Sequence, residues 1–154
     1  MSDIRDIYPM PSFAGLEVAD TAASSRFYQD ALGFTDIFTM PNPSGMPMLV
    51  HLRWVKWADV LLRPAFGPPA GPKGLGFGLT FTVFEGGLDG VDALFERARA
   101  HGATIVTEPG NRPWNARDFT VADPDGFRLT FTRGPVKTDL SFDEVMKQAN
   151  PATA

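Results

Sequence analysis

One order of predicted elements occurs twice in the chain, and this repeat constrains the fold more than any other feature. Apolar periodicity predicts a strand, a helix and three further strands in each half. In the first half the predicted ranges are 12–20, 21–32, 35–40, 48–56 and 58–63. In the second half they are 78–83, 89–100, 103–107, 117–122 and 127–133. Gly33 and Gly102 end the two predicted helices about 69 residues apart, so we interpret the chain as an internal duplication.

Each half is too small to enclose a core by itself. A helix covers one face of a four-stranded sheet, and the other face needs a further layer. We therefore predict an α+β fold in which two tandem βαβββ modules face each other and form a curved mixed sheet around a cavity. The predicted units are a first module over 11–66, a proline- and glycine-rich linker over 67–77, a second module over 78–134 and a tail over 135–154. The tail contains a short helix over 142–149, which Ser141 and Glu144 open as a capping box.

Composition narrows the class of protein. With 154 residues, 44% of them hydrophobic, the chain is long enough to bury a core without disulfides. It has no cysteine, which excludes a disulfide scaffold, a thiol nucleophile and cysteine-ligated zinc or iron–sulfur sites. The net charge of −4 argues against nucleic acid or an anionic membrane as the partner. No uncharged run approaches the length of a membrane span, and the first residues lack a signal pattern, so we expect a cytoplasmic protein.

Short motifs in both halves are similar to those of a known superfamily. Leu16–Asp20, Ser25–Tyr28 and Leu32–Phe34 open the first half, and a segment that contains Asp123-Pro-Asp-Gly126 closes the second. Over about residues 11–134 the chain resembles the vicinal oxygen chelate superfamily, which includes glyoxalase I, extradiol dioxygenases and fosfomycin- and bleomycin-resistance proteins. The resemblance implies paired βαβββ modules, a homodimer and a ligand site inside the concave sheet.

The resemblance also bears on metal binding. Enzymes of this superfamily hold a divalent metal on cavity-facing strands, and the corresponding positions here fall at Phe13, near Arg63, near Gly78 and at Thr130. None of these side chains is a suitable metal ligand, and the charge of Arg63 would repel a cation. The resemblance therefore places this chain with the metal-free, bleomycin-resistance-like members.

The residues alone lead to the same expectation. A non-haem iron triad needs two histidines and a carboxylate. The chain has two histidines, and His101 is predicted at the exposed C-terminal end of a helix, away from His51. An oxygen-ligated magnesium or calcium site that includes Glu17 stays open. We predict no metal and no cofactor.

Without a metal, the cavity is predicted to bind its ligand through aromatic and weakly polar side chains. The candidates are Phe13, Trp54, Trp57, Arg63, Trp114 and Thr130. Aromatic faces stack on flat or cationic ligands, and an arginine recognises a carboxylate or phosphate. The tryptophans can equally be core residues, and Arg63 can instead pair with Glu17. Thr80 and Thr82 are predicted to face the cavity with Thr130.

Two side chains are candidates for a catalytic base, namely His51 and Glu17. A structural role within its strand is the alternative for His51. Arg117 and Asp118 are predicted either to close the pocket or to form a surface pair.

These observations favour a metal-free small-molecule-binding protein of the glyoxalase/bleomycin-resistance type, which sequesters a partly aromatic ligand in an inter-module cavity. A role in antibiotic resistance follows only by analogy. A metal-dependent glyoxalase-like lyase or dioxygenase is one alternative, and a metal-free isomerase or lyase that uses His51 or Glu17 is another. The partners we expect are a small-molecule ligand and a second copy of the chain, but neither nucleic acid nor a membrane.

Overall fold

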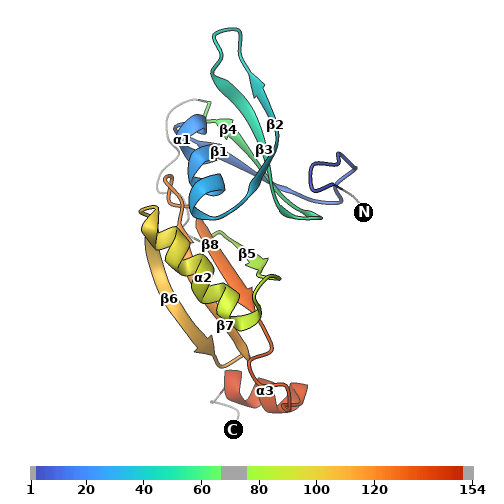
Figure 1. Ribbon diagram of the computed structural model, residues 1–154. Helices are drawn as coiled ribbons and strands as arrows, with labels where there is room; N and C mark the ends of the chain where they lie inside the picture. The colour runs from blue at the N-terminus through green and yellow to red at the C-terminus, as the bar shows by residue number, and fades with distance from the viewer. Residues whose placement is uncertain (1–2, 67–75, 151–154) are drawn as a thin grey trace.

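The computed structural model describes residues 3–66 and 76–150, and in this part of the chain the strands form two four-stranded sheets (Figure 1). The first half contains β1 (Ala14–Val18), α1 (Thr21–Arg26), the π-helical segment η1 (Phe27–Ala31), β2 (Thr35–Pro41), β3 (Pro47–Val55) and β4 (Ala58–Pro64). The second half contains β5 (Gly78–Thr82), α2 (Gly87–Ala100), β6 (Thr104–Arg112), β7 (Ala116–Ala122) and β8 (Arg128–Arg133), followed by α3 (Phe142–Ala149). This order confirms the prediction of an α+β fold with two tandem βαβββ modules.

The two sheets have the same strand order. Module 1, the first half, is arranged β1-β4-β3-β2, and module 2, the second half, is arranged β5-β8-β7-β6. In each module the first and last strands pair in parallel, and the other pairs are antiparallel. A parallel pair cannot be joined by a hairpin, so the chain crosses over between its first and last strands, and the helix lies in this connection.

The first predicted helix is observed with a change of winding. Asp20 caps it, since its side chain accepts a hydrogen bond from the backbone N–H of Ala23. After Arg26 the α-helix continues as η1, and Gly33 follows with a φ of +83°. This positive φ is why glycine ends the segment, as predicted.

β6 is longer than predicted. The sequence suggested a strand over 103–107, but β6 continues to Arg112 and includes Pro109. β6 is an edge strand, where a residue without an N–H can face away from the sheet, and register shifts between Thr107 and Gly110 absorb the irregular residues.

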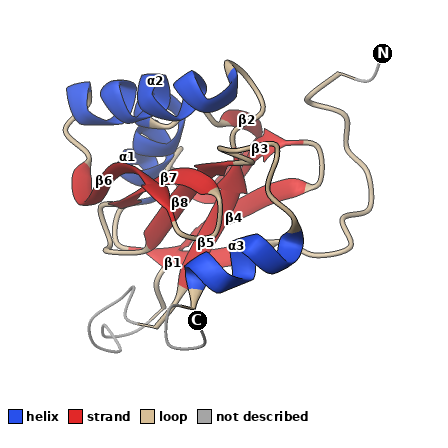
Figure 2. Ribbon diagram, turned by 90° about the horizontal axis from the view of Figure 1, so that it is seen from below, coloured by secondary structure: helices blue, strands red, loops and turns tan. Residues whose placement is uncertain are grey.

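Both helices α1 and α2 lie on the same side of the molecule (Figures 1 and 2). The strand residues that face the core on this side are Leu16, Val18, Val50, Leu52, Val60 and Leu62 in module 1, and Phe81, Phe119, Val121, Leu129 and Phe131 in module 2. Neither helix covers the opposite sheet faces, which we call the open face of module 1 and the open face of module 2. The two open faces point to the same side of the molecule. The two sheets of one chain therefore do not face each other, and the predicted arrangement of facing modules is wrong in this respect.

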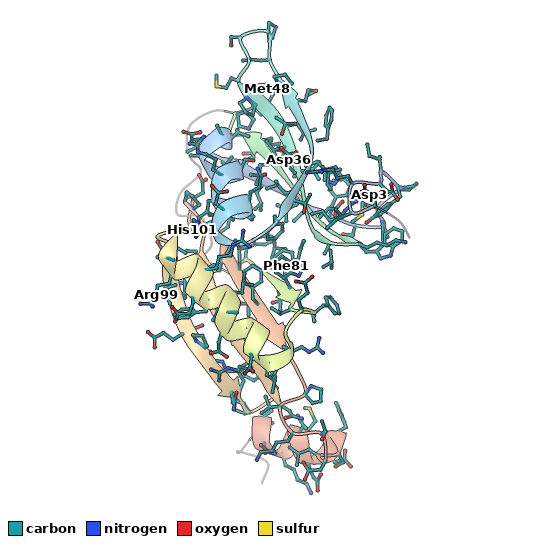
Figure 3. The ribbon with its side chains drawn as sticks, viewed as in Figure 1. Asp3, Asp36, Met48, Phe81, Arg99 and His101 are labelled. Carbon is teal, nitrogen blue, oxygen red and sulfur yellow. The ribbon has the colours of Figure 1, made fainter. Side chains whose placement is uncertain are left out.

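The two modules join through a shared hydrophobic core. The ring of Trp54 lies 5.2 Å from that of Phe131 and 6.3 Å from that of Phe81, and Phe34 lies 5.3 Å from Phe81 (centroid distances). Figure 3 labels Phe81 at this junction. The indole N–H of Trp54 donates to the carbonyl of Thr82 at 2.8 Å. Trp54 therefore holds the modules together.

Polar contacts join the modules as well. The buried hydroxyl of Tyr28 donates to Oδ2 of Asp123 at 2.9 Å. On the other side of η1, Arg97 of α2 donates to the backbone carbonyls of Gln29 and Asp30 at 3.0 and 2.8 Å. The end of the first helix is thus held by the second module.

Part of the predicted linker over 67–77 lies outside the described residues, as do residues 151–154 of the predicted tail. α3 occupies the range predicted for it, and its capping box between Ser141 and Glu144 is formed. In the described ranges no helix is long and apolar enough to cross a membrane.

Candidate functional site

The open face of module 1 is built from alternate residues of its four strands. One row across it consists of register partners on β2, β3, β4 and β1, namely Phe38, His51, Leu61 and Gly15. Phe38 is 48% exposed, and a Cβ atom at Gly15 would meet no atom within 4 Å. The row therefore places an aromatic ring, an imidazole and an aliphatic chain beside open space.

A neighbouring row of this face carries an ion pair. Nη2 of Arg63 donates to Oε1 of Glu17 at 3.2 Å, and the two residues are register partners on β4 and β1. Both side chains are about half exposed, so the pair contributes little to stability and a competing ligand can open it. Phe13, just before β1, is also exposed.

Beside this row lies a buried network that the sequence did not lead us to predict. Nε2 of His51 lies 2.6 Å from Oδ2 of Asp59, and Arg53 donates to the two oxygens of Asp59 from Nε at 2.7 Å and from Nη2 at 2.8 Å. Burial alone would raise the pKa of Asp59, but hydrogen bonds from Arg53 and His51 outweigh it and hold this pKa below its usual range. Asp59 is therefore ionised at neutral pH.

An N-terminal arm, residues 3–12, covers the network. Nη1 of Arg53 donates to the backbone carbonyls of Ile4 and Asp6 at 2.6 and 2.8 Å. The ring of Tyr8 lies over the same guanidinium, 4.3 Å from its carbon atom. The arm thus closes the end of the open face that adjoins the β3–β4 turn.

Hydroxyl groups line the open face of module 2. A row of register partners crosses β5, β8, β7 and β6, namely Thr80, Thr130, Thr120 and Thr107. The hydroxyls of Thr120 and Thr130 are 2.7 Å apart. Thr82 and Thr132 begin the next row. This face offers hydrogen-bond donors and acceptors where module 1 offers apolar surface and an ion pair.

The predicted tryptophans lie in three separate places. Trp54 lies on the helix side and lines a cavity of about 600 Å³ between the modules. Trp57 forms the β3–β4 turn with a φ of +71° and packs against Tyr8. Trp114 lies in the β6–β7 turn and is 56% exposed. The structure therefore brings Phe13 and Arg63 to one open face and Thr130 to the other, but it does not bring the tryptophans together.

Arg117 and Asp118 point to opposite sides of β7 and do not form the surface pair that the sequence suggested. Arg117 instead donates to both oxygens of Asp92 on α2, at 2.6 and 2.8 Å. Hydrogen bonding to Arg117 lowers the pKa of Asp92. Asp118 accepts a hydrogen bond from Nε of Arg112 at 2.8 Å.

The residues at the superfamily's metal positions do not fit a metal ion. These residues are Phe13, Arg63, whose guanidinium is paired with Glu17, Gly78, and Thr130, whose hydroxyl lies within hydrogen-bond distance of that of Thr120. Within residues 3–66 and 76–150, no three His, Cys, Asp or Glu side chains gather in a way that could hold an ion. No metal-dependent step can be assigned to these side chains.

Comparisons with known proteins agree with this architecture. An uncharacterised protein of Mycobacterium bovis is 32% identical over 134 residues, which cover 84% of this chain and 86% of that protein. The lactoylglutathione lyase of Haemophilus influenzae is 30% identical over 122 residues, which cover 75% and 86%. The structure of TnmS3, an antibiotic binding protein from Streptomyces sp. CB03234, is similar with a TM-score of 0.61 at 23% identity, covering 82% of this chain and 96% of that one.

A family model also matches, and its extent agrees with the structure. It spans residues 12–131, from just before β1 into β8, and so covers nearly all of both modules and the junction between them. The chain belongs to the Glyoxalase/Bleomycin resistance protein/Dioxygenase superfamily.

Proposed function

We propose that this protein is a metal-free homodimer that binds a small, partly aromatic molecule and sequesters it in the cytoplasm. The composition of the two open faces is the observation that supports this proposal. One offers Phe13, Phe38 and Leu61 beside the ion pair of Glu17 and Arg63, and the other offers a row of threonines. A ligand between two such faces would meet apolar surface on one side and hydroxyls on the other, the composition typical of small-molecule sites.

A second copy of the chain is the partner that would close the site. The two open faces of one chain point to the same side, so they cannot enclose a ligand by themselves (Figure 2). In a two-fold dimer, module 1 of one copy would face module 2 of its partner, and the symmetry would repeat this contact. Phe13, Phe38 and Met40 are each about half exposed, and burying them would favour association.

The relatives support two functions. TnmS3 is an antibiotic binding protein with this fold, which supports sequestration and, with it, a role in antibiotic resistance. The lactoylglutathione lyase relative favours a metal-dependent lyase as the second candidate. The side chains at the metal positions argue for the first, because none of them is a good metal ligand and Arg63 would repel a cation.

Calorimetric titration with bleomycin and with a panel of flat aromatic compounds tests binding. We expect a compound that binds the wild-type protein to bind Arg63→Ala and Thr130→Val more weakly, because each variant removes a polar contact from one open face. Arg99→Ala and Thr138→Val are matched controls, since Arg99 lies exposed on α2 and Thr138 lies exposed beyond β8. Equal affinity in all variants, or no binding by any compound, would contradict the proposal.

Elemental analysis of protein purified without chelator tests the alternative. One equivalent of a divalent metal together with lactoylglutathione lyase activity would show that the protein is a metal-dependent enzyme and would contradict the proposed binding protein.

Analytical ultracentrifugation tests the dimer. We expect the wild-type chain to sediment as a dimer and Phe38→Glu to shift it towards monomer. Phe142→Glu places the same charge on α3, at a side chain that is 77% exposed, and serves as the control. A monomeric wild-type chain would show that the open faces have another role.

A further inference from the structure

We propose that His51 is the proton acceptor of the ligand site and that the ligand it recognises carries an acidic hydroxyl, that of a phenol or an enol. This inference rests on the proposed function, since it places the ligand on the open face of module 1. It adds the chemical class of the ligand and the residue that selects for it.

His51 occupies the middle of this face. Its register partners Phe38 and Leu61 flank it, and Gly15 beyond Leu61 leaves open space. The side chain of His51 is 20% exposed. A flat ring that lies on this row would contact apolar neighbours and have the imidazole within reach of its substituents.

Asp59 determines which nitrogen of the imidazole meets the ligand. Nε2 lies 2.6 Å from Oδ2 of Asp59, and because that carboxyl is ionised, Nε2 carries the hydrogen and donates it. Among the described residues nothing hydrogen-bonds to Nδ1, and no buried side-chain nitrogen there lacks a partner, so Nδ1 reaches the surface. The lone pair of Nδ1 is therefore available to an acidic group.

The fold explains why positions 53 and 59 carry a buried ion pair, but it does not explain why position 51 is a histidine. Arg53 holds the N-terminal arm and needs a buried counter-charge, and it already donates to both oxygens of Asp59. The ion pair is thus complete without the imidazole, and an apolar residue at position 51 would leave it intact. A carboxylate beside Nε2 instead fixes the tautomer of the imidazole that leaves the lone pair on Nδ1.

The step is a proton transfer that needs no further reactant. The O–H bond of the ligand breaks as the Nδ1–H bond forms, and the electron pair stays on the ligand oxygen. The products are an oxyanion and an imidazolium that remain in contact, with Asp59 at the far nitrogen of the ring. Arg63 lies on the neighbouring row of the same face, and its positive charge favours the same anion.

The compounds 4-nitrophenol and 4-nitroanisole separate the contribution of the hydroxyl from that of the ring. They share the ring and the nitro group, and only the phenol can give up a proton, which changes its visible absorbance. The full chain is titrated with each compound by calorimetry and by absorbance, in buffer below the pKa of free 4-nitrophenol. We expect 4-nitrophenol to bind about tenfold more tightly, the gain from one hydrogen bond to a charged group, and to show phenolate absorbance when bound.

Two histidine variants make the test specific. His51→Gln keeps a side-chain N–H for Asp59 but has no basic nitrogen, so we expect the affinity ratio to fall to about one. The far-UV circular dichroism spectrum and the Tm of His51→Gln should match those of the wild-type protein, which shows that the variant is still folded. His101→Gln is the matched control, because His101 is the chain's other histidine and lies exposed at the C-terminal end of α2 (Figure 3).

The outcomes separate the two proposals. If both compounds bind the wild-type protein equally, or if His51→Gln keeps the ratio, the role of His51 is wrong while the proposed function stands. If neither compound binds, the role of His51 is wrong, and the titrations with bleomycin and the aromatic panel decide the proposed function separately.

Discussion

Replacing Tyr28 by phenylalanine removes the hydroxyl that joins the first helix to the second module. This hydroxyl donates to Oδ2 of Asp123 at 2.9 Å, and the two residues are 0% and 4% exposed. The ring keeps its edge-on contacts with Phe27 and Phe34, so the substitution opens little space. Its main effect is to deprive a buried carboxylate oxygen of a donor.

The expected loss in the free energy of unfolding follows from the loss of this hydrogen-bond donor. A buried acceptor left without its hydrogen bond costs about 1–3 kcal/mol. A loss of about 2 kcal/mol would lower the Tm of a chain of this size by about 4–8 °C. Differential scanning calorimetry measures the shift directly. Urea denaturation gives the same free energy of unfolding independently, and the slope of that transition should not change.

The chain has two tyrosines, so Tyr8→Phe is a matched control. The hydroxyl of Tyr8 accepts a hydrogen bond from the backbone N–H of Trp57 at 3.0 Å, and Trp57 is 52% exposed. Water can replace that hydroxyl, so we expect a cost within about 0.5 kcal/mol. Equal losses of stability in the two variants would refute the importance of the buried contact.

The penalty should also depend on pH. Burial raises the pKa of Asp123, and the hydrogen bond from Tyr28 opposes this rise because it stabilises the carboxylate. Tyr28→Phe therefore raises the pKa of Asp123 in the folded protein further. The penalty should be complete above that pKa and should shrink as the pH falls through it. A penalty that is the same at neutral and acidic pH would show that the carboxylate is not the partner that matters.

Three arginine substitutions should have different effects, one on a pKa and two on the free energy of unfolding. Arg117→Gln should raise the pKa of Asp92 towards its ordinary value, which carbon NMR of the carboxyl group measures, because the hydrogen bonds from Arg117 hold it down. Arg97→Ala should lower the free energy of unfolding by about 1–2 kcal/mol in urea titrations, since it removes hydrogen bonds to two carbonyls of η1. Arg63→Ala should change that free energy by less than about 1 kcal/mol in the same assay, because its pair with Glu17 is exposed.

Local signals in the sequence predicted most of the fold. Ser141 and Glu144 form a capping box within one turn of chain, and α3 occupies the predicted range. Asp20 and Gly33 mark the two ends of the first helix in the same way. Such signals act between residues a few positions apart, so one sequence is sufficient to read them. The duplication then follows from repeating the same signals.

Contacts between distant segments were not predictable in this way. Arg53 is almost fully buried because its partners come from the adjacent strand and from Ile4 and Asp6 in the arm, and nothing near Arg53 in the sequence indicates them. The alternation in β3 places His51 and Arg53 on one face, and register with β4 adds Asp59. A correct assignment of this strand's faces would have shown the three side chains together. The relative orientation of the two sheets has no such local signal.

Most of the residues that carry the family resemblance lie apart from the open faces, on which we propose that a ligand binds. Glu17, within Leu16–Asp20, is the exception, because it lies on the open face of module 1. Tyr28 and the Asp123-Pro-Asp-Gly126 turn meet on the helix side, where they join the modules. The open faces lie on the opposite side and carry Phe38, His51 and the threonines instead. The shared motifs thus preserve the arrangement of the modules while leaving the chemistry of the faces free to differ. Substitutions at the motif should therefore lower stability and leave ligand preference unchanged. Substitutions on the open faces should change ligand preference and leave stability nearly unchanged.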